Sequence, residues 1–173
     1  MTEKLLAISV LLLCALAAPA ETEHPPFSLM TPPGLAQPQL SRTLTGETWA
    51  YLATQRGQPT RLLITVMAAT DIENLLGTFS DARCVNLFVD ELRRQYDDFF
   101  VIEMKRPLAL GPSELPQFRW TGRRVSSMLT GVLSCGQLAD RYYIIDFVDE
   151  LQNASHSFPG VRAALRSFSA APR

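Results

Sequence analysis

The stretch RYYIIDFVDE at residues 141–150 gives the clearest secondary-structure signal in the chain. It is dense in aromatic and β-branched residues, which favour extended backbone. Because side chains alternate between the two faces of a strand, Tyr143, Ile145 and Phe147 share one face. The other face carries Tyr142, Ile144, Asp146 and Val148. The sequence therefore predicts a strong strand that is apolar on both faces apart from one carboxylate.

That carboxylate, Asp146, has two interpretations. If its face is buried, the carboxylate needs a partner, and Arg141 or an arginine of FRWTGRR at 118–124 could supply it. If its face is exposed, Asp146 belongs to the polar side of the sheet. We favour the exposed interpretation.

The end of this strand overlaps the pentapeptide FVDEL, which also occurs at 88–92. The first copy lies within SDARCVNLFVDELRRQYDDF, where apolar residues such as Val85, Phe88 and Leu92 recur at helical spacing. The second copy ends a strand, and the flanking sequences RRQYDD and QNASHS do not match. True repeats are similar over their whole period, so the sequence indicates coincidence here.

The remaining segments complete an α+β pattern in which an antiparallel sheet packs against helices. TWAYLATQ and TRLLITVMA, separated by the turn RGQP, predict a hairpin over 48–68. Residues 118–135 predict either one long bent strand or two strands that meet at Gly122 and Arg123. The other expected elements are an edge strand at 27–30, a short helix at 70–76, a strand at 99–110, a loop at 111–116, a turn at 136–140, a loop at 153–160 and a last helix at 159–168.

The N-terminus has the pattern of a secretory signal peptide. Lys4 precedes the apolar run from Leu5 to Ala18, and Ala18-Pro19-Ala20 provides small residues around a cleavage site after Ala20. The run is short for a transmembrane helix, which needs about 20 apolar residues. The expected organisation is a signal peptide at 1–20, a proline-rich arm at 21–46 that is extended or irregular apart from the edge strand, and a single α+β domain at 47–173. We therefore expect a periplasmic protein.

The charge of the chain excludes some partners. The formal net charge is −1 at pH 7, with 16 basic and 17 acidic residues. A near-neutral chain does not indicate nucleic acid or an anionic membrane surface as its partner. No second apolar stretch is long enough to span a membrane, so we expect no stable span after signal cleavage.

Two of the three cysteines follow the predicted signal peptide, at Cys84 and Cys135. An even pair in an oxidising compartment favours a disulfide. Closing a loop of this length stabilises a fold by about 4 kcal/mol in the chain-entropy model. A redox-active pair is the alternative, but no Cys-x-x-Cys arrangement lowers a thiol pKa here.

Several of these segments resemble the PsbP-like family, which includes bacterial periplasmic proteins of the DcrB type. The resemblance rests on FSLMTPPG at 27–34, the helix SDARCVNLFVDELRRQY, RYYIIDFV and LRSF at 165–168. It implies an α/β/α sandwich that serves mainly as a binding or assembly module. It transfers no catalytic residues.

No catalytic or cofactor motif stands out from the rest of the sequence. No nucleophile elbow, zinc-protease, phosphate-loop or calcium-loop pattern occurs, and we expect no cofactor or metal. The histidines are His24 in the arm and His156 in NASHSF, which also holds a glycosylation sequon at Asn153. A triad of His156 with Ser155 or Ser157 is disfavoured, because near neighbours in sequence rarely face each other correctly. The adjacent acidic pairs at 90–91, 97–98 and 149–150 do not form two-carboxylate sites.

The stretch FRWTGRR interleaves aromatic residues with arginines. Period two places Arg119, Thr121 and Arg123 on one face and Phe118, Trp120 and Gly122 on the other. A charged edge strand is one interpretation, since charge protects edges from pairing. A surface for a protein partner is the other, because Trp and Arg are frequent hot-spot residues. The candidate partner surface comprises Arg119, Trp120, Arg123, Asp97 and Asp98.

Together these observations predict an exported, non-catalytic module that binds a protein partner in the cell envelope, as an accessory subunit or assembly factor. A periplasmic inhibitor or immunity protein against a secreted toxin is the alternative. The alternative from another class is a hydrolase, which a buried Asp–Arg–His cluster in a pocket would support.

Overall fold

The structure is a computed structural model that describes residues 24–43, 46–55, 57–77 and 79–170. The predicted signal peptide and its cleavage after Ala20 lie outside these residues. Among the helices that the structure describes, none is both long and apolar enough to cross a membrane.

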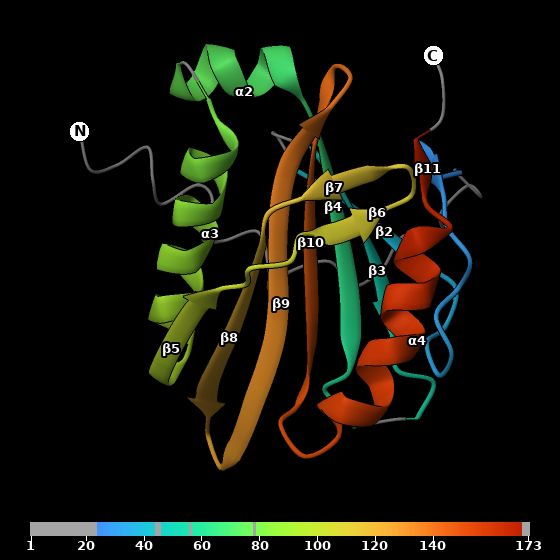
Figure 1. Cartoon of the computed structure of the whole chain (residues 1–173), viewed down its shortest axis with the longest axis vertical. Coiled ribbons are helices and arrows are strands. Elements are labelled where there is room, and N and C mark those ends of the chain that lie inside the picture. Colours follow the sequence, from blue (N-terminus) through green and yellow to red (C-terminus); the bar gives the residue numbers. More distant parts are fainter. Residues whose placement is uncertain (1–23, 44–45, 56, 78, 171–173) are drawn as a thin grey trace.

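A seven-stranded antiparallel sheet forms the centre of the molecule (Figure 1). This arrangement with helices packed on it confirms the α+β prediction. In spatial order, its strands are β2 (Gln39–Arg42), β3 (Glu47–Leu52), β4 (Arg61–Ala68), β10 (Arg141–Glu150), β9 (Ser127–Leu138), β8 (Gln117–Arg124) and β5 (Asp97–Glu103).

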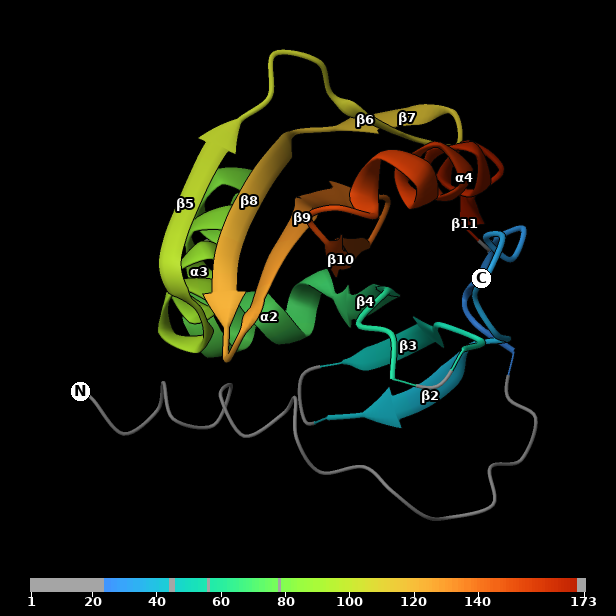
Figure 2. The same ribbon diagram turned by 90° about the horizontal axis from the view of Figure 1, so that it is seen from below.

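The strand predicted from RYYIIDFVDE is β10, and it occupies the middle of the sheet. It pairs with β9 along its whole length and with β4 from Arg141 to Val148. Tyr143 and Ile145 point to one side and Ile144 to the other, and all three are buried. A strand with two apolar faces suits this position, because helices cover the sheet on both sides (Figure 2).

One layer consists of α2 (Ala69–Leu76) and α3 (Asp81–Gln95). Ser80 caps α3 by accepting a hydrogen bond from the backbone N–H of Arg83. The apolar stripe of α3 packs on the face of the sheet that carries Tyr142 and Ile144. The helical residues buried there are Cys84, Val85, Val89 and Leu92.

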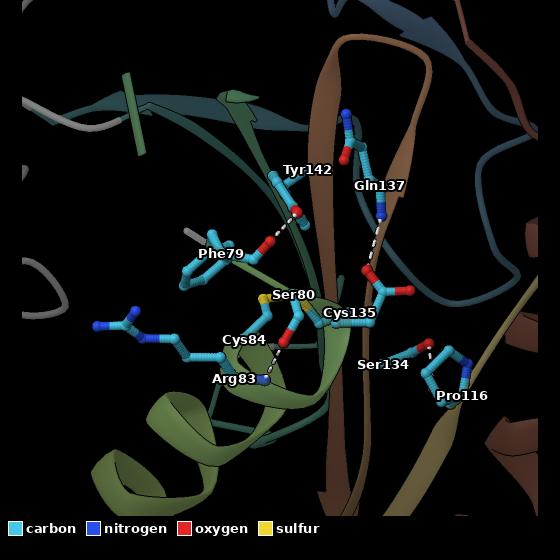
Figure 3. Close-up of a disulfide and its surroundings, with 10 residues drawn as sticks. Phe79, Ser80, Arg83, Cys84, Pro116, Ser134, Cys135, Gln137 and Tyr142 are labelled. Carbon is cyan, nitrogen blue, oxygen red and sulfur yellow. Dashed lines mark hydrogen bonds between the residues drawn. A yellow bond between two sulfur atoms is a disulfide. The ribbon is translucent and has the colours of Figure 1, made fainter. Parts of the chain in front are cut away.

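The disulfide joins this helix to the sheet (Figure 3). It links Cys84, near the start of α3, to Cys135 in β9, with Cα atoms 6.1 Å apart and a sequence separation of 51. Both residues are fully buried. Nearby, the Tyr142 hydroxyl donates to the backbone carbonyl of Phe79 at 2.9 Å. The predicted cysteine pairing is therefore confirmed, and it holds the first turns of α3 against the sheet.

The opposite face of the sheet is covered by smaller elements. They are α4 (Ala154–Arg166), the hairpin of β6 (Leu108–Leu110) and β7 (Ser113–Leu115), and the pair formed by β1 (Phe27–Ser28) and β11 (Ser169–Ala170). Phe27 stacks on Phe168 with ring centroids 5.4 Å apart, so residues from both ends of the described chain share one core with Tyr143 and Phe147.

The structure corrects four predicted elements in addition to the strand at 99–110, which is divided into β5 and β6. Residues 111–116, predicted as a loop, contain β7. Residues 118–135 form two strands, but these meet at a turn after Arg124 instead of at Gly122, and β9 continues to Leu138. The arm at 21–46, predicted to be extended or irregular apart from an edge strand at 27–30, also contains β2, because its segment after Pro38 pairs with β3.

The fourth correction concerns residues 153–160, predicted as a loop but forming the first half of α4. Pro159 lies inside this helix and cannot donate a backbone hydrogen bond. Two tertiary contacts hold the segment helical. The Ser157 hydroxyl donates to the Asp149 carboxylate at 2.5 Å, and the Phe158 ring packs edge-on against Phe147 at 5.3 Å.

Candidate functional site

The β5 end of the sheet is covered on one face only. The helix α3 lies against one face of β5, whereas none of the described helices lies over the other face (Figure 2). On that open face Phe100 is 62% exposed and Ile102 is 45% exposed. Large apolar side chains at such exposure on an edge strand indicate an interaction surface.

The neighbouring strand β8 adds polar and cationic side chains to the same face. Thr121 pairs with Phe100 and Arg119 pairs with Ile102, so all four project from one side of the sheet. Met128 of β9 lies beyond, 37% exposed. We call this set, Phe100, Ile102, Arg119, Thr121 and Met128, the β5 strip.

The outer edge of β5 pairs with no strand among the described residues. Its first half is irregular, because the register shifts between Asp97 and Phe100 and Asp98 has a φ of 49°. Bulges of this kind discourage pairing at an edge. The second half, Phe100 to Glu103, is regular and leaves backbone groups available to an incoming strand.

The structure brings together only some of the residues that were predicted to form the partner surface. Arg119 and Arg123 lie on the open face, and Arg123 forms an ion pair with Asp98 at 2.6 Å. Asp97 is also exposed, at the start of β5. Because the Arg123–Asp98 pair is exposed on both sides, its contribution to stability is small.

Trp120 does not belong to this surface, and its predicted role there is wrong. It is 1% exposed and packs under α3, with its ring centroid 4.8 Å from that of Tyr96 and 6.0 Å from that of Phe99. Gly131 provides the space on the neighbouring strand, since a Cβ atom there would lie 2.6 Å from the indole ring. Trp120 is a core residue.

Asp146 is withdrawn from solvent, so the interpretation that we favoured for it is wrong. Its Oδ1 atom is buried and has no hydrogen-bond partner, although the residue as a whole keeps some exposed area. Burial raises the pKa of Asp146, and the guanidinium of Arg61 and the indole of Trp120 lower it by less. The arginine that the buried interpretation required comes from β4, not from position 141 or from FRWTGRR.

No hydrolase triad forms around His156. This exposed residue lies in α4, whereas Asp146 and Arg61 lie on the opposite face of the sheet. The Ser157 hydroxyl donates to Asp149, whose carboxylate also accepts from the Thr60 hydroxyl at 2.8 Å. Asp149 is 1% exposed, so this arrangement serves to fasten the start of α4.

Two hollows occur on the α4 side of the described residues. One, about 550 Å³, lies between the N-terminal arm and β11 and includes His24 and Tyr51. Burial raises the pKa of Tyr51 to about 12, so this phenol stays neutral near pH 7. The other, about 320 Å³, runs along α4. Within the described ranges, no group of three or more His, Cys, Asp or Glu side chains could hold a metal ion.

The sequence does not reveal the β5 strip as a unit. Alternation in FFVIE places Phe100 and Ile102 on one face of a strand and Phe99 and Val101 on the other, and this much can be read from the sequence. Which of the two faces a helix covers depends on the order of the strands and on the path of α3. Only the tertiary structure provides that information.

Comparisons with known proteins give one informative result. No protein-family model matches the sequence, and no curated protein matches it in sequence. Among solved structures, the fold is similar to that of LpqN, whose crystal structure is described as that of a protein involved in cell envelope biogenesis of Mycobacterium tuberculosis. The likeness covers 84% of this chain and 83% of that chain, with a TM-score of 0.55 and 9% sequence identity. At this identity the likeness concerns the fold alone.

Proposed function

We propose that this chain is an exported, non-catalytic binding module of the cell envelope, and that it binds a protein partner through the β5 strip. The observation that carries the proposal is the exposure of Phe100 and Ile102 on an edge strand whose outer side is unpaired. Unpaired apolar edges promote aggregation unless a partner covers them. The partner is therefore part of the working state of the protein.

The chemistry of the strip defines the segment that it accepts. A strand added to β5 gains main-chain hydrogen bonds along Phe100 to Glu103 and places alternate side chains on the open face. Apolar side chains of that strand contact Phe100 and Ile102. An acidic side chain meets Arg119, which forms no ion pair among the described residues. The partner segment is extended, apolar and acidic.

Several features support an envelope location. A buried disulfide suits an oxidising compartment, and the sequence begins with the pattern of a signal peptide. The similar fold of LpqN belongs to a protein described as involved in cell envelope biogenesis. The PsbP-like resemblance of the sequence agrees with a binding or assembly role in the periplasm.

The test is site-specific photocrosslinking in intact cells. A photoreactive residue at Ile102 is expected to give one protein adduct of defined mass. The matched control is position 52, because Leu52 is 39% exposed and lies in β3, near the opposite edge of the sheet. The adduct from position 102 should disappear when Arg119 is changed to Glu, since the acidic partner segment is then repelled.

Three results would contradict the proposal. Position 102 could give no adduct above that of position 52, or it could give the same set of adducts. An adduct with twice the mass of the protein would identify a second copy of this chain as the occupant instead. The identity of a specific partner then separates an accessory subunit from an inhibitor of a toxin.

A further inference from the structure

The hollow along α4 brings together arginines without an acidic partner. It is lined by Ser155, Phe158, Pro159, Arg162 and Arg166 and has a volume of about 320 Å³. Arg162 and Arg166 are four residues apart on the helix and therefore share one face. Arg119 of β8 is close enough to act electrostatically on Arg162. We call these residues, Arg119, Arg162 and Arg166, the arginine groove.

Four arginines elsewhere in the described part of the chain form ion pairs. Arg42, Arg93, Arg94 and Arg123 each contact a carboxylate, at 2.6–3.3 Å. None of the ion pairs in this part of the molecule includes a residue of the arginine groove. The groove is therefore a local concentration of positive charge in a chain whose formal net charge is −1.

Neutral contacts hold Arg162 in a defined position. Its Nη2 atom donates to Oε1 of Gln117 at 3.2 Å, and Gln117 is only 2% exposed. Its guanidinium lies over the Phe158 ring, 4.8 Å from the ring centroid. A guanidinium has five N–H donors, so most donors remain available to a ligand.

The electrostatics of this arrangement favour an anion. Partial burial lowers the pKa of Arg162, and the neighbouring charges of Arg166 and Arg119 lower it further. Like charges that are held together destabilise a fold. A bound anion would remove this repulsion.

We infer that the arginine groove is a binding site for a phosphate group carried by an organic ligand. The two guanidinium groups that line the hollow, Arg162 and Arg166, with the positive charge of Arg119 acting on them, match a phosphomonoester, which carries roughly −1.5 to −2 charges near pH 7, better than they match a single carboxylate. The planar fork of arginine forms paired hydrogen bonds with phosphate oxygens. Phe158 and Pro159 provide an apolar wall for the organic part of the ligand.

This inference goes beyond the proposed function and does not depend on it. The β5 strip is formed by β5, β8 and β9, whereas Arg162 and Arg166 belong to α4. The two sites share Arg119. Variants of Arg162 and Arg166 therefore test the groove without changing the apolar side chains of the strip.

The first probe is inorganic phosphate, titrated into the purified protein in dilute chloride buffer and followed by amide NMR shifts. We expect saturable shifts in α4 and around Gln117. The double variant Arg162→Gln/Arg166→Gln should weaken binding at least tenfold, whereas Arg162→Lys/Arg166→Lys should recover only part of it, because lysine lacks the fork. The matched control is Arg124→Gln, which removes one charge from an exposed position in β8.

The second probe separates the sources of the phosphate. Phosphatidylcholine vesicles with phosphatidic acid, compared with vesicles of phosphatidylcholine alone, test a lipid headgroup. Binding of inorganic phosphate together with the phosphatidic acid vesicles indicates a lipid, and binding of phosphate alone indicates a soluble phosphomonoester. The inference is overturned if neither probe binds, or if Arg124→Gln weakens binding as much as the double variant does. A circular dichroism melt of each variant checks that it folds.

Discussion

The two layers that cover the sheet are fastened by different means. The α3 layer is joined to β9 by the disulfide between Cys84 and Cys135. The α4 layer has no disulfide to the sheet among the described residues, and it is held by hydrogen bonds from Ser157 to Asp149 and from Arg162 to Gln117. The α3 layer carries no candidate site, whereas both candidate sites lie on the α4 side of the sheet.

Buried polar atoms without a hydrogen-bond partner occur beneath both layers. On the α3 side, Asp146, Arg61 and Trp120 each have one, and on the α4 side the indole nitrogen of Trp49 is another. The buried polar side chains on the α4 side, which are Gln117, Thr130, Ser134 and Asp149, all form hydrogen bonds. Most buried polar groups beneath the α4 layer are therefore paired.

The largest expected effect comes from breaking the tether. The double variant Cys84→Ala/Cys135→Ala should lower the free energy of unfolding by about 4 kcal/mol, because the unfolded chain regains the entropy of the closed loop. Urea unfolding followed by tryptophan fluorescence measures it. A change below about 1 kcal/mol would show that α3 is held by its apolar contacts alone.

The second largest change in the free energy of unfolding is expected at the hydrogen bonds that hold the start of α4. The Asp149 carboxylate accepts hydrogen bonds from the hydroxyls of Thr60 and Ser157 and from the backbone N–H of Glu150. Asp149→Asn replaces one of its oxygens with an NH₂ group, which then faces a donor instead of accepting from it. We expect a loss of about 2–3 kcal/mol, because a buried charged acceptor is removed. Ser157→Ala, which deletes one of these hydrogen bonds, should lose about 1 kcal/mol. Equal effects of the two variants would argue against a shared network.

A third prediction concerns the pH dependence of the α3 side. Because the pKa of Asp146 is raised in the folded state, the native protein holds this proton more tightly than the unfolded chain. Its contribution to stability is therefore present below the ordinary value of 3.8 and is lost as the pH rises from there through the raised pKa.

Asp146→Asn should make the stability curve flatter over that range. Urea midpoints measured at a series of pH values for both proteins give the comparison. If the two curves run parallel, Asp146 does not titrate with folding.

The smallest effect is expected at the β5 strip. Phe100→Ser and Ile102→Thr change exposed side chains, so each should alter the free energy of unfolding by no more than about 0.5 kcal/mol. Light scattering should show lower self-association than in the wild type, since less apolar surface is exposed. A loss above about 2 kcal/mol in the same unfolding assay would mean that these residues belong to the core.

The elements with strong local signals could be predicted from the sequence. The alternation in RYYIIDFVDE and the helical spacing of apolar residues in α3 are local patterns, so they can be read from neighbouring residues in the sequence. The disulfide could be predicted because the two remaining cysteines could pair only with each other. The first turns of α4 could not be predicted, because their helical form depends on Asp149 and Phe147 from another element.

The candidate sites show the same limit. Sequence alternation assigned Arg119 and Arg123 correctly to one face of β8, but it could not show that α3 buries the other face with Trp120. Arg61 was not considered as a partner of Asp146, because the contact joins strands that are far apart in sequence. Which faces remain open follows from the tertiary arrangement.

The central position of β10 has a consequence for how the chain matures. This strand is the last of the large sheet to be synthesised, yet it separates β4 from β9. Until residues 141–150 are available, β2 to β4 and the hairpin of β8 and β9 have no common partner and cannot form one sheet. Such long-range pairing is slow to form. The order of the strands therefore delays completion of the large sheet until late in synthesis.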